Sequence, residues 1–148
     1  MTRDEIIHDL QAFFNVRELV CPHVYAKWGE QSWQFLDTAY LHTILVLRRD
    51  ILRVPLVCNT KTLTQRGFRC NMCELVKEKR SVYVSAHMLG KGGDFTSSEM
   101  SAERMRNEIK KQSGKLPYPV RIEGGVSWLH IDVIPQYGVH SKVYEFKA

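Results

Sequence analysis

Apolar residues recur at helical spacing in several segments of this chain. The pattern covers residues 4–14, 33–52 and 98–112, where apolar side chains return every three or four positions. That period is typical of an amphipathic helix with one buried face. Residues 71–79 leave room for a shorter helix. The first two long helices precede every clear β-like segment, so the pattern predicts that helices come first along the chain.

Residues 15–30 lack any such period. Cys21-Pro22-His23 and Trp28-Gly29 interrupt it, and proline and glycine in a polar context favour a loop. His23 has no partner at the spacing of metal ligands. We therefore expect an irregular connection here, with His23 at the surface.

Short β-like runs fill the rest of the sequence. Residues 120–123 and 127–134 alternate around Gly124-Gly125, which is typical of a hairpin. The full set of expected strands is residues 54–59, 81–85, 94–96, 120–123, 127–134 and an edge strand at 142–146. The order of these elements predicts an α+β fold in a single domain, residues 1–148, with N-terminal helices packed on a small, mostly antiparallel sheet.

Two histidines and one aspartate stand out as candidate metal ligands. His87 and Asp94 are seven residues apart with three glycines between them, and His130 lies in a later β-like run. On one helix the first two would be about 10 Å apart, too far to share an ion. Glycines allow the chain to double back and bring them together. Two imidazoles and one carboxylate are the protein ligands of an open zinc site; a surface turn at Asp94 and a core histidine at 130 are the plainer alternatives.

The surrounding residues carry a family resemblance. The pattern Ser85-x-His87-x-x-Gly90-x-Gly92-x-Asp94, followed by Trp128-x-His130-x-Asp132, resembles the zinc D-Ala-D-Ala metallopeptidases, over roughly residues 40–135. That family shares its fold with the hedgehog signalling domain and includes carboxypeptidases, dipeptidases and phage endolysins. Gly92 stands where the family has a small alanine.

The resemblance implies a site and an activity. His87, Asp94 and His130 would hold Zn2+, and Arg69 would bind a substrate carboxylate, with an ordinary surface salt bridge as the equal alternative. Ser85 lies two residues before His87 on the same face of the chain, so we also expect it to bind substrate. The expected reaction is hydrolysis of a peptide bond in a peptidoglycan stem, as in a D-Ala-D-Ala carboxypeptidase or an L-Ala-D-Glu-type endopeptidase.

The catalytic base departs from the family pattern. Many members carry an acidic residue three positions before the last histidine, where this chain has Ser127. Glu123 would reach the site if Gly124-Gly125 turns the chain back. Asp132 shares a strand face with His130 and would act as base or orient that histidine. We prefer Glu123. If neither serves, the chain would be a non-catalytic zinc module or a phage structural protein of the same fold.

Composition and net charge limit the kinds of binding partner that we expect. The 148 residues are 44% hydrophobic and carry a net charge of +5, which suits an anionic polymer such as cell wall. The basic residues are scattered, so nucleic acid is not expected as a partner. No membrane-length apolar stretch and no signal peptide are visible. We expect a cytoplasmic monomer that reaches the cell wall when released, as a phage or prophage lysin does.

The four cysteines are Cys21, Cys58, Cys70 and Cys73. Cys70-Asn71-Met72-Cys73 has the form of a redox or zinc pair, but Cys21 and Cys58 do not supply a second close pair. Reduced, buried or half-buried thiols are therefore the default expectation.

Overall fold

The computed structural model describes residues 1–147 and has the predicted α+β class. Its helices are α1 (Arg3–Leu10), α2 (Val16–Leu19), α3 (Pro22–Trp28), α4 (Thr38–Val46), α5 (Glu74–Lys77) and α6 (Ala102–Lys111). Its strands are β1 (Gly92–Phe95), β2 (Val120–Gly124), β3 (Leu129–Asp132) and β4 (Val143–Lys147). Three irregular helical turns, η1 (Gly29–Phe35), η2 (Leu47–Ile51) and η3 (Ser113–Lys115), complete the elements.

The four strands form one mixed sheet in the order β1-β3-β2-β4. β3 pairs antiparallel with both β1 and β2, as a hairpin across Gly124-Gly125 requires. β4 lies at the edge, as predicted, but it runs parallel to β2. The two central strands therefore come from the hairpin, and β1 is added from an earlier part of the chain.

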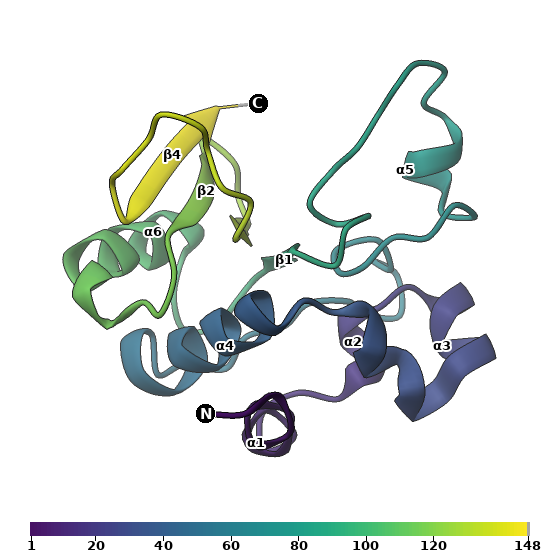
Figure 1. The fold of residues 1–148 in the computed structure, drawn as a ribbon, viewed down its shortest axis with the longest axis horizontal. Coiled ribbons are helices and arrows are strands. Elements are labelled where there is room, and N and C mark those ends of the chain that lie inside the picture. The colour runs from purple at the N-terminus through teal and green to yellow at the C-terminus, as the bar shows by residue number, and fades with distance from the viewer. Residues whose placement is uncertain (148) are drawn as a thin grey trace.

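Helices cover one face of this sheet. α4 and α1 run beneath β1, and α6 lies beside β2 and β4 in Figure 1. Phe95 of β1 packs edge-on against Phe14, with ring centroids 6.0 Å apart. Leu129 and Ile131 of β3 are fully buried in the same core. Because side chains alternate along a strand, His130 and Asp132 point to the opposite face.

The helix starts follow from capping residues. Thr2 and Glu5 form a reciprocal capping box at the start of α1. Asp37 accepts hydrogen bonds from the amides of Ala39 and Tyr40 at the start of α4. Each cap satisfies amides that have no partner inside the helix. Asp37 also explains why the helix expected over residues 33–52 begins late, after the separate turn η1.

Residues 15–30 do not form the loop that the sequence predicted. They contain α2 and α3, and Pro22 is the first residue of α3. Proline is well tolerated there because the first helical amide needs no partner and the ring already has a helical φ. The prediction was wrong because it treated Pro22 as a break when it marks a start.

Two expected strands are also absent from the described residues. Residues 54–59 contribute only an isolated bridge between Val57 and Thr96. Residues 81–85 form no strand, and Val82 is 99% exposed. The sequence pattern favoured strands, but neither segment lies beside a strand along its length. Packing against neighbours and burial decide whether such a segment forms a strand. The helix expected over residues 71–79 shortens to α5.

Among the helices of residues 1–147, none combines the length and apolar character needed to cross a membrane.

Candidate active site

His87, Asp94 and His130 lie together on the open face of the sheet. One ligand atom from each lies within 4.8 Å of the others. Nδ1 of His130 is 2.8 Å from Oδ1 of Asp94, and Nε2 of His87 is 3.4 Å from Oδ2. All three side chains are buried. The structure thus brings together the three residues that the sequence pattern singled out.

Backbone pairing fixes two of these residues. Asp94 of β1 and His130 of β3 are directly opposite each other in the antiparallel register, and opposed residues share a face of the sheet. β1 begins at Gly92, two residues before the expected start of the strand.

His87 lies just before a tight turn at Gly90. Gly90 has φ +68°, and an added Cβ there would fall 2.0 Å from the carbonyl oxygen of Phe35. The Gly90 carbonyl accepts a hydrogen bond from Asp37 at the start of α4. Glycine alone fits this left-handed, crowded position. The turn is thereby fixed against α4 and returns the chain toward Asp94.

In both imidazoles, the ring nitrogen that faces away from Asp94 lies close to a hydrogen-bond acceptor. Nδ1 of His87 is 2.9 Å from the Gly67 carbonyl oxygen, and Nε2 of His130 is 2.8 Å from Oδ2 of Asp132. The other two ring nitrogens, Nε2 of His87 and Nδ1 of His130, face Asp94 and donate to it when protonated; with a metal ion bound, they would instead offer their lone pairs to the ion. Such outer partners fix the tautomer and ring orientation of metal-binding histidines.

The charges of the site are stabilised mutually. Burial favours the neutral form of Asp94, but hydrogen bonds from His130 and His87 outweigh it and hold the pKa of that carboxyl well below its usual range. Burial also disfavours the His130 cation, yet hydrogen bonds to Asp132 and Asp94 raise its pKa to about 9. Two carboxylates therefore remain charged around His130, an environment that favours a cation.

A pocket of about 330 Å³ opens over these residues. Besides the three candidate ligands, its walls include Arg69, Ser85, Glu123, Trp128 and Phe146. Both residues expected to bind substrate are therefore in the wall. Arg69 donates from Nε to the Gln65 carbonyl at 2.6 Å, and its Nη2 is 3.8 Å from Asp94.

The two candidate bases occupy different places. Glu123 of β2 lies in the pocket wall. Asp132 has no exposed surface: it accepts hydrogen bonds from Arg121 at 2.8 and 3.0 Å and contacts His130 from behind. Asp132 is thus bound to His130 and Arg121 and has no exposed surface, whereas Glu123 lines the pocket. Ser127 is exposed in the turn between β2 and β3.

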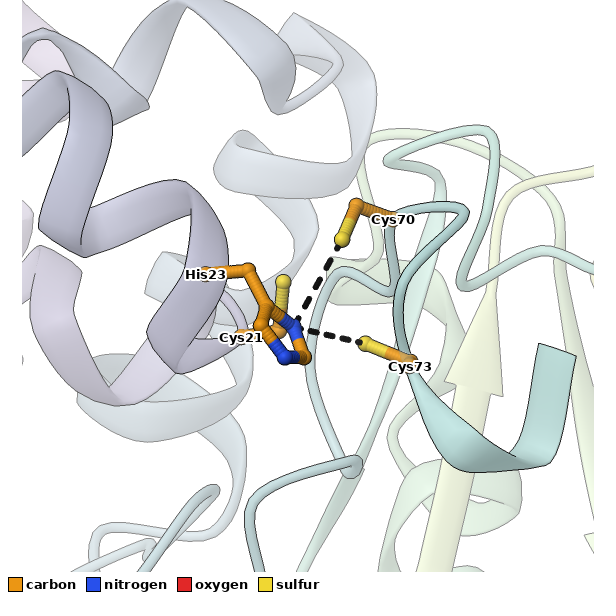
Figure 2. Close-up of side chains that lie close together, drawn as sticks. All are labelled: Cys21, His23, Cys70 and Cys73. Carbon is orange, nitrogen blue, oxygen red and sulfur yellow. Dashed lines mark hydrogen bonds between the residues drawn. The ribbon is translucent and has the colours of Figure 1, made fainter. Parts of the chain in front are cut away.

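A second candidate metal cluster, which sequence reasoning missed, is formed by Cys21, His23, Cys70 and Cys73 (Figure 2). Nδ1 of His23 lies 3.7 Å from the Cys70 sulfur and 3.8 Å from the Cys73 sulfur. This cluster could bind a metal ion. His23 is exposed, as expected, but the expectation that it lacks metal-binding partners was wrong, because two of its partners are distant in sequence. The available signal was a Cys-x-His pair 47 residues before a Cys-x-x-Cys pair.

Two thiols of this cluster, those of Cys21 and Cys73, are buried, whereas Cys70 is partly exposed. Burial raises the pKa of the Cys21 thiol, and burial together with the neighbouring Cys21 raises that of Cys73 to about 12. Cys58, the remaining cysteine, is fully buried elsewhere in the core.

Comparisons of this chain with protein-family models, with curated proteins and with solved structures find no significant match.

Proposed function

We propose that this chain is a zinc-dependent metallopeptidase that hydrolyses a peptide bond in peptidoglycan stem peptides. The observation that carries the proposal is the convergence of His87, Asp94 and His130 in the wall of a pocket that also contains Glu123 and Arg69. The motif that these residues share with the zinc D-Ala-D-Ala metallopeptidases supports the choice of reaction.

The donor set fits zinc. His87, Asp94 and His130 offer two nitrogens and one carboxylate oxygen, the composition of catalytic zinc sites that keep a fourth position for water or substrate. Both imidazoles have outer hydrogen-bond acceptors, Gly67 and Asp132. A bound zinc ion would lower the pKa of a water molecule and polarise the scissile carbonyl.

The other wall residues have distinct roles in this proposal. Glu123 accepts the proton of the attacking water and passes it to the leaving amine, as a general base and then a general acid. Arg69 directs its guanidinium toward a substrate carboxylate, for which its planar fork of donors is suited. Ser85 offers a hydroxyl to the peptide backbone. Asp132 holds His130 in its binding orientation.

The substrate class is supported by charge and by the resemblance. Stem peptides of peptidoglycan carry free carboxylates, and a net charge of +5 favours an anionic polymer. A carboxylate near the scissile bond would meet Arg69 inside the pocket.

The test uses the purified, zinc-loaded chain of 148 residues. We expect it to release peptides or amino acids from purified peptidoglycan, identified by mass spectrometry. His87→Ala and Asp94→Ala should abolish this release and lower the zinc content together. Retention of full activity and full zinc by either variant would refute the site. Zinc binding without cleavage of any stem chemistry would instead identify a non-catalytic zinc module, the alternative that Ser127 at the usual acidic position favours.

A further inference from the structure

The four side chains of the second cluster come from two segments of the chain. Cys21 directly precedes α3 and His23 lies in its first turn, while Cys70 and Cys73 flank a turn that leads into α5. Figure 2 shows the His23 ring directed between the sulfurs of Cys70 and Cys73, with Cys21 beside it.

Backbone hydrogen bonds hold these two segments together independently of the side chains. Cys21 donates to the Phe68 carbonyl and Phe68 donates to the Leu19 carbonyl, both at 2.9 Å. A Cβ on Gly67 would fall 2.3 Å from the Leu19 carbonyl oxygen. Glycine permits this close approach, so the cluster is assembled by the fold and is not a chance encounter of surface side chains.

The geometry matches a tetrahedral ion. Bonds of about 2.3 Å to sulfur and about 2.0 Å to nitrogen place adjacent ligand atoms of a tetrahedron roughly 3.6 Å apart. Nδ1 of His23 is 3.7 and 3.8 Å from two of the sulfurs, and all four ligand atoms lie within 4.8 Å of one another. Only small side-chain movements are needed to close such a site.

We propose that Cys21, His23, Cys70 and Cys73 bind a structural Zn2+ ion. Three thiolates and one imidazole select a borderline-soft metal such as zinc. Four protein ligands fill the tetrahedron and leave no position for substrate, which distinguishes a structural site from a catalytic one. The backbone amide of Met72 donates to the Cys70 sulfur at 3.3 Å, an outer contact of the kind that stabilises a bound thiolate.

A disulfide explains the arrangement less well. A disulfide between any two of the cysteines would give no reason for the third sulfur and the imidazole of His23 to lie beside them. The four candidate ligand atoms instead all lie within 4.8 Å of one another.

The ion would stabilise a part of the chain that has little else to order it. Between residues 52 and 92 the only regular element is the four-residue α5. Zinc binding contributes directly to folding free energy where a segment cannot form a core of its own. The ligands join α3 to the segment that carries Gly67 and Arg69, so the ion fixes one wall of the neighbouring pocket.

The test begins with the 148-residue chain purified under reducing conditions with zinc. We expect two zinc ions per chain by native mass spectrometry. Cobalt substituted for zinc should give the thiolate charge-transfer absorption of a tetrahedral sulfur-rich site. In His87→Ala, X-ray absorption of the remaining zinc should show three sulfur ligands and one nitrogen. This readout does not depend on the proposed peptidase activity, so the two proposals can fail separately.

Variants provide the matched comparison. Cys70→Ser should lose one zinc ion per chain and the thiolate absorption, whereas Cys58→Ser, outside the cluster, should keep both. If Cys70→Ser fails to fold, the wild-type cobalt spectrum and the His87→Ala ligand count still decide the question. Zinc ligated only by nitrogen and oxygen, or a disulfide in the reduced and zinc-supplied protein, would overturn the proposal.

Discussion

Asp132 and His130 are held together on one face of β3, with Oδ2 of the carboxylate 2.8 Å from Nε2 of the imidazole. Asp94 lies at the other ring nitrogen, also at 2.8 Å. The imidazole is therefore clamped between a candidate metal ligand and a carboxylate that is itself fixed by Arg121.

Replacing the Asp132 carboxylate should weaken zinc binding without removing a metal ligand. We expect Asp132→Asn to reduce zinc affinity at the His87–Asp94–His130 site by about 10- to 100-fold, because outer partners tune metal ligands by that much. A competing zinc indicator measures the affinity. Arg121→Gln, which keeps the Asp132–His130 contact, should have a smaller effect; an equal loss would assign the effect to the ion pair instead.

Glu123 should affect turnover and not metal content. Glu123→Gln is expected to lower kcat by about 10²- to 10⁴-fold, the usual contribution of a general base, with zinc stoichiometry unchanged. Glu145→Gln is the control, since Glu145 pairs with Lys110 at 2.8 Å outside the pocket. Unchanged hydrolysis by Glu123→Gln would remove Glu123 from the mechanism.

Gly92 should resist enlargement even to alanine. A Cβ there would lie 2.6 Å from the Cβ of Asp132 and 2.8 Å from that of Ala86. Overpacking of this kind costs about 1–3 kcal/mol, so Gly92→Ala should lower the free energy of unfolding measured with denaturant. Gly114→Ala, where an added Cβ meets nothing within 4 Å, should leave stability nearly unchanged. Equal stabilities for the two variants would contradict the contact.

Arg106 should stabilise the turn that leads into β3. It is buried in α6 and donates to the carbonyls of Val126 and Trp128, both at 3.1 Å. Arg106→Met should cost about 1–3 kcal/mol by leaving two part-buried acceptors without this donor. Thermal unfolding measures this loss. Arg104→Met, on the exposed side of the same helix, should be close to neutral, and a comparable loss there would point to helix propensity.

Local patterns predicted parts of the candidate active site, whereas the full ligand set was predicted from the family resemblance. The glycines around position 90 indicated a reversal of the chain, and the alternation near residue 130 placed His130 and Asp132 on one face. The small residue at position 92 also has a physical reason: its place opposite Asp132 in the sheet leaves no room for a side chain.

Other features depend on contacts that no local pattern encodes. The direction of β4 is set by its pairing with β2, about twenty residues earlier. The exposed valines at positions 82 and 84 give the sequence pattern of a strand, but no neighbouring strand in residues 1–147 pairs with them. Cys21 and His23 meet Cys70 and Cys73 only because the backbones of Val20 and Phe68 pair.

Residues 67–69 contact both clusters through backbone groups. The Gly67 carbonyl contacts the His87 ring, and the Phe68 carbonyl accepts the amide of Cys21. A chelator that abolishes activity would therefore act on either ion or on both. Inactivation by chelation alone would not identify the metal of the active site, and recovery must be followed one metal equivalent at a time.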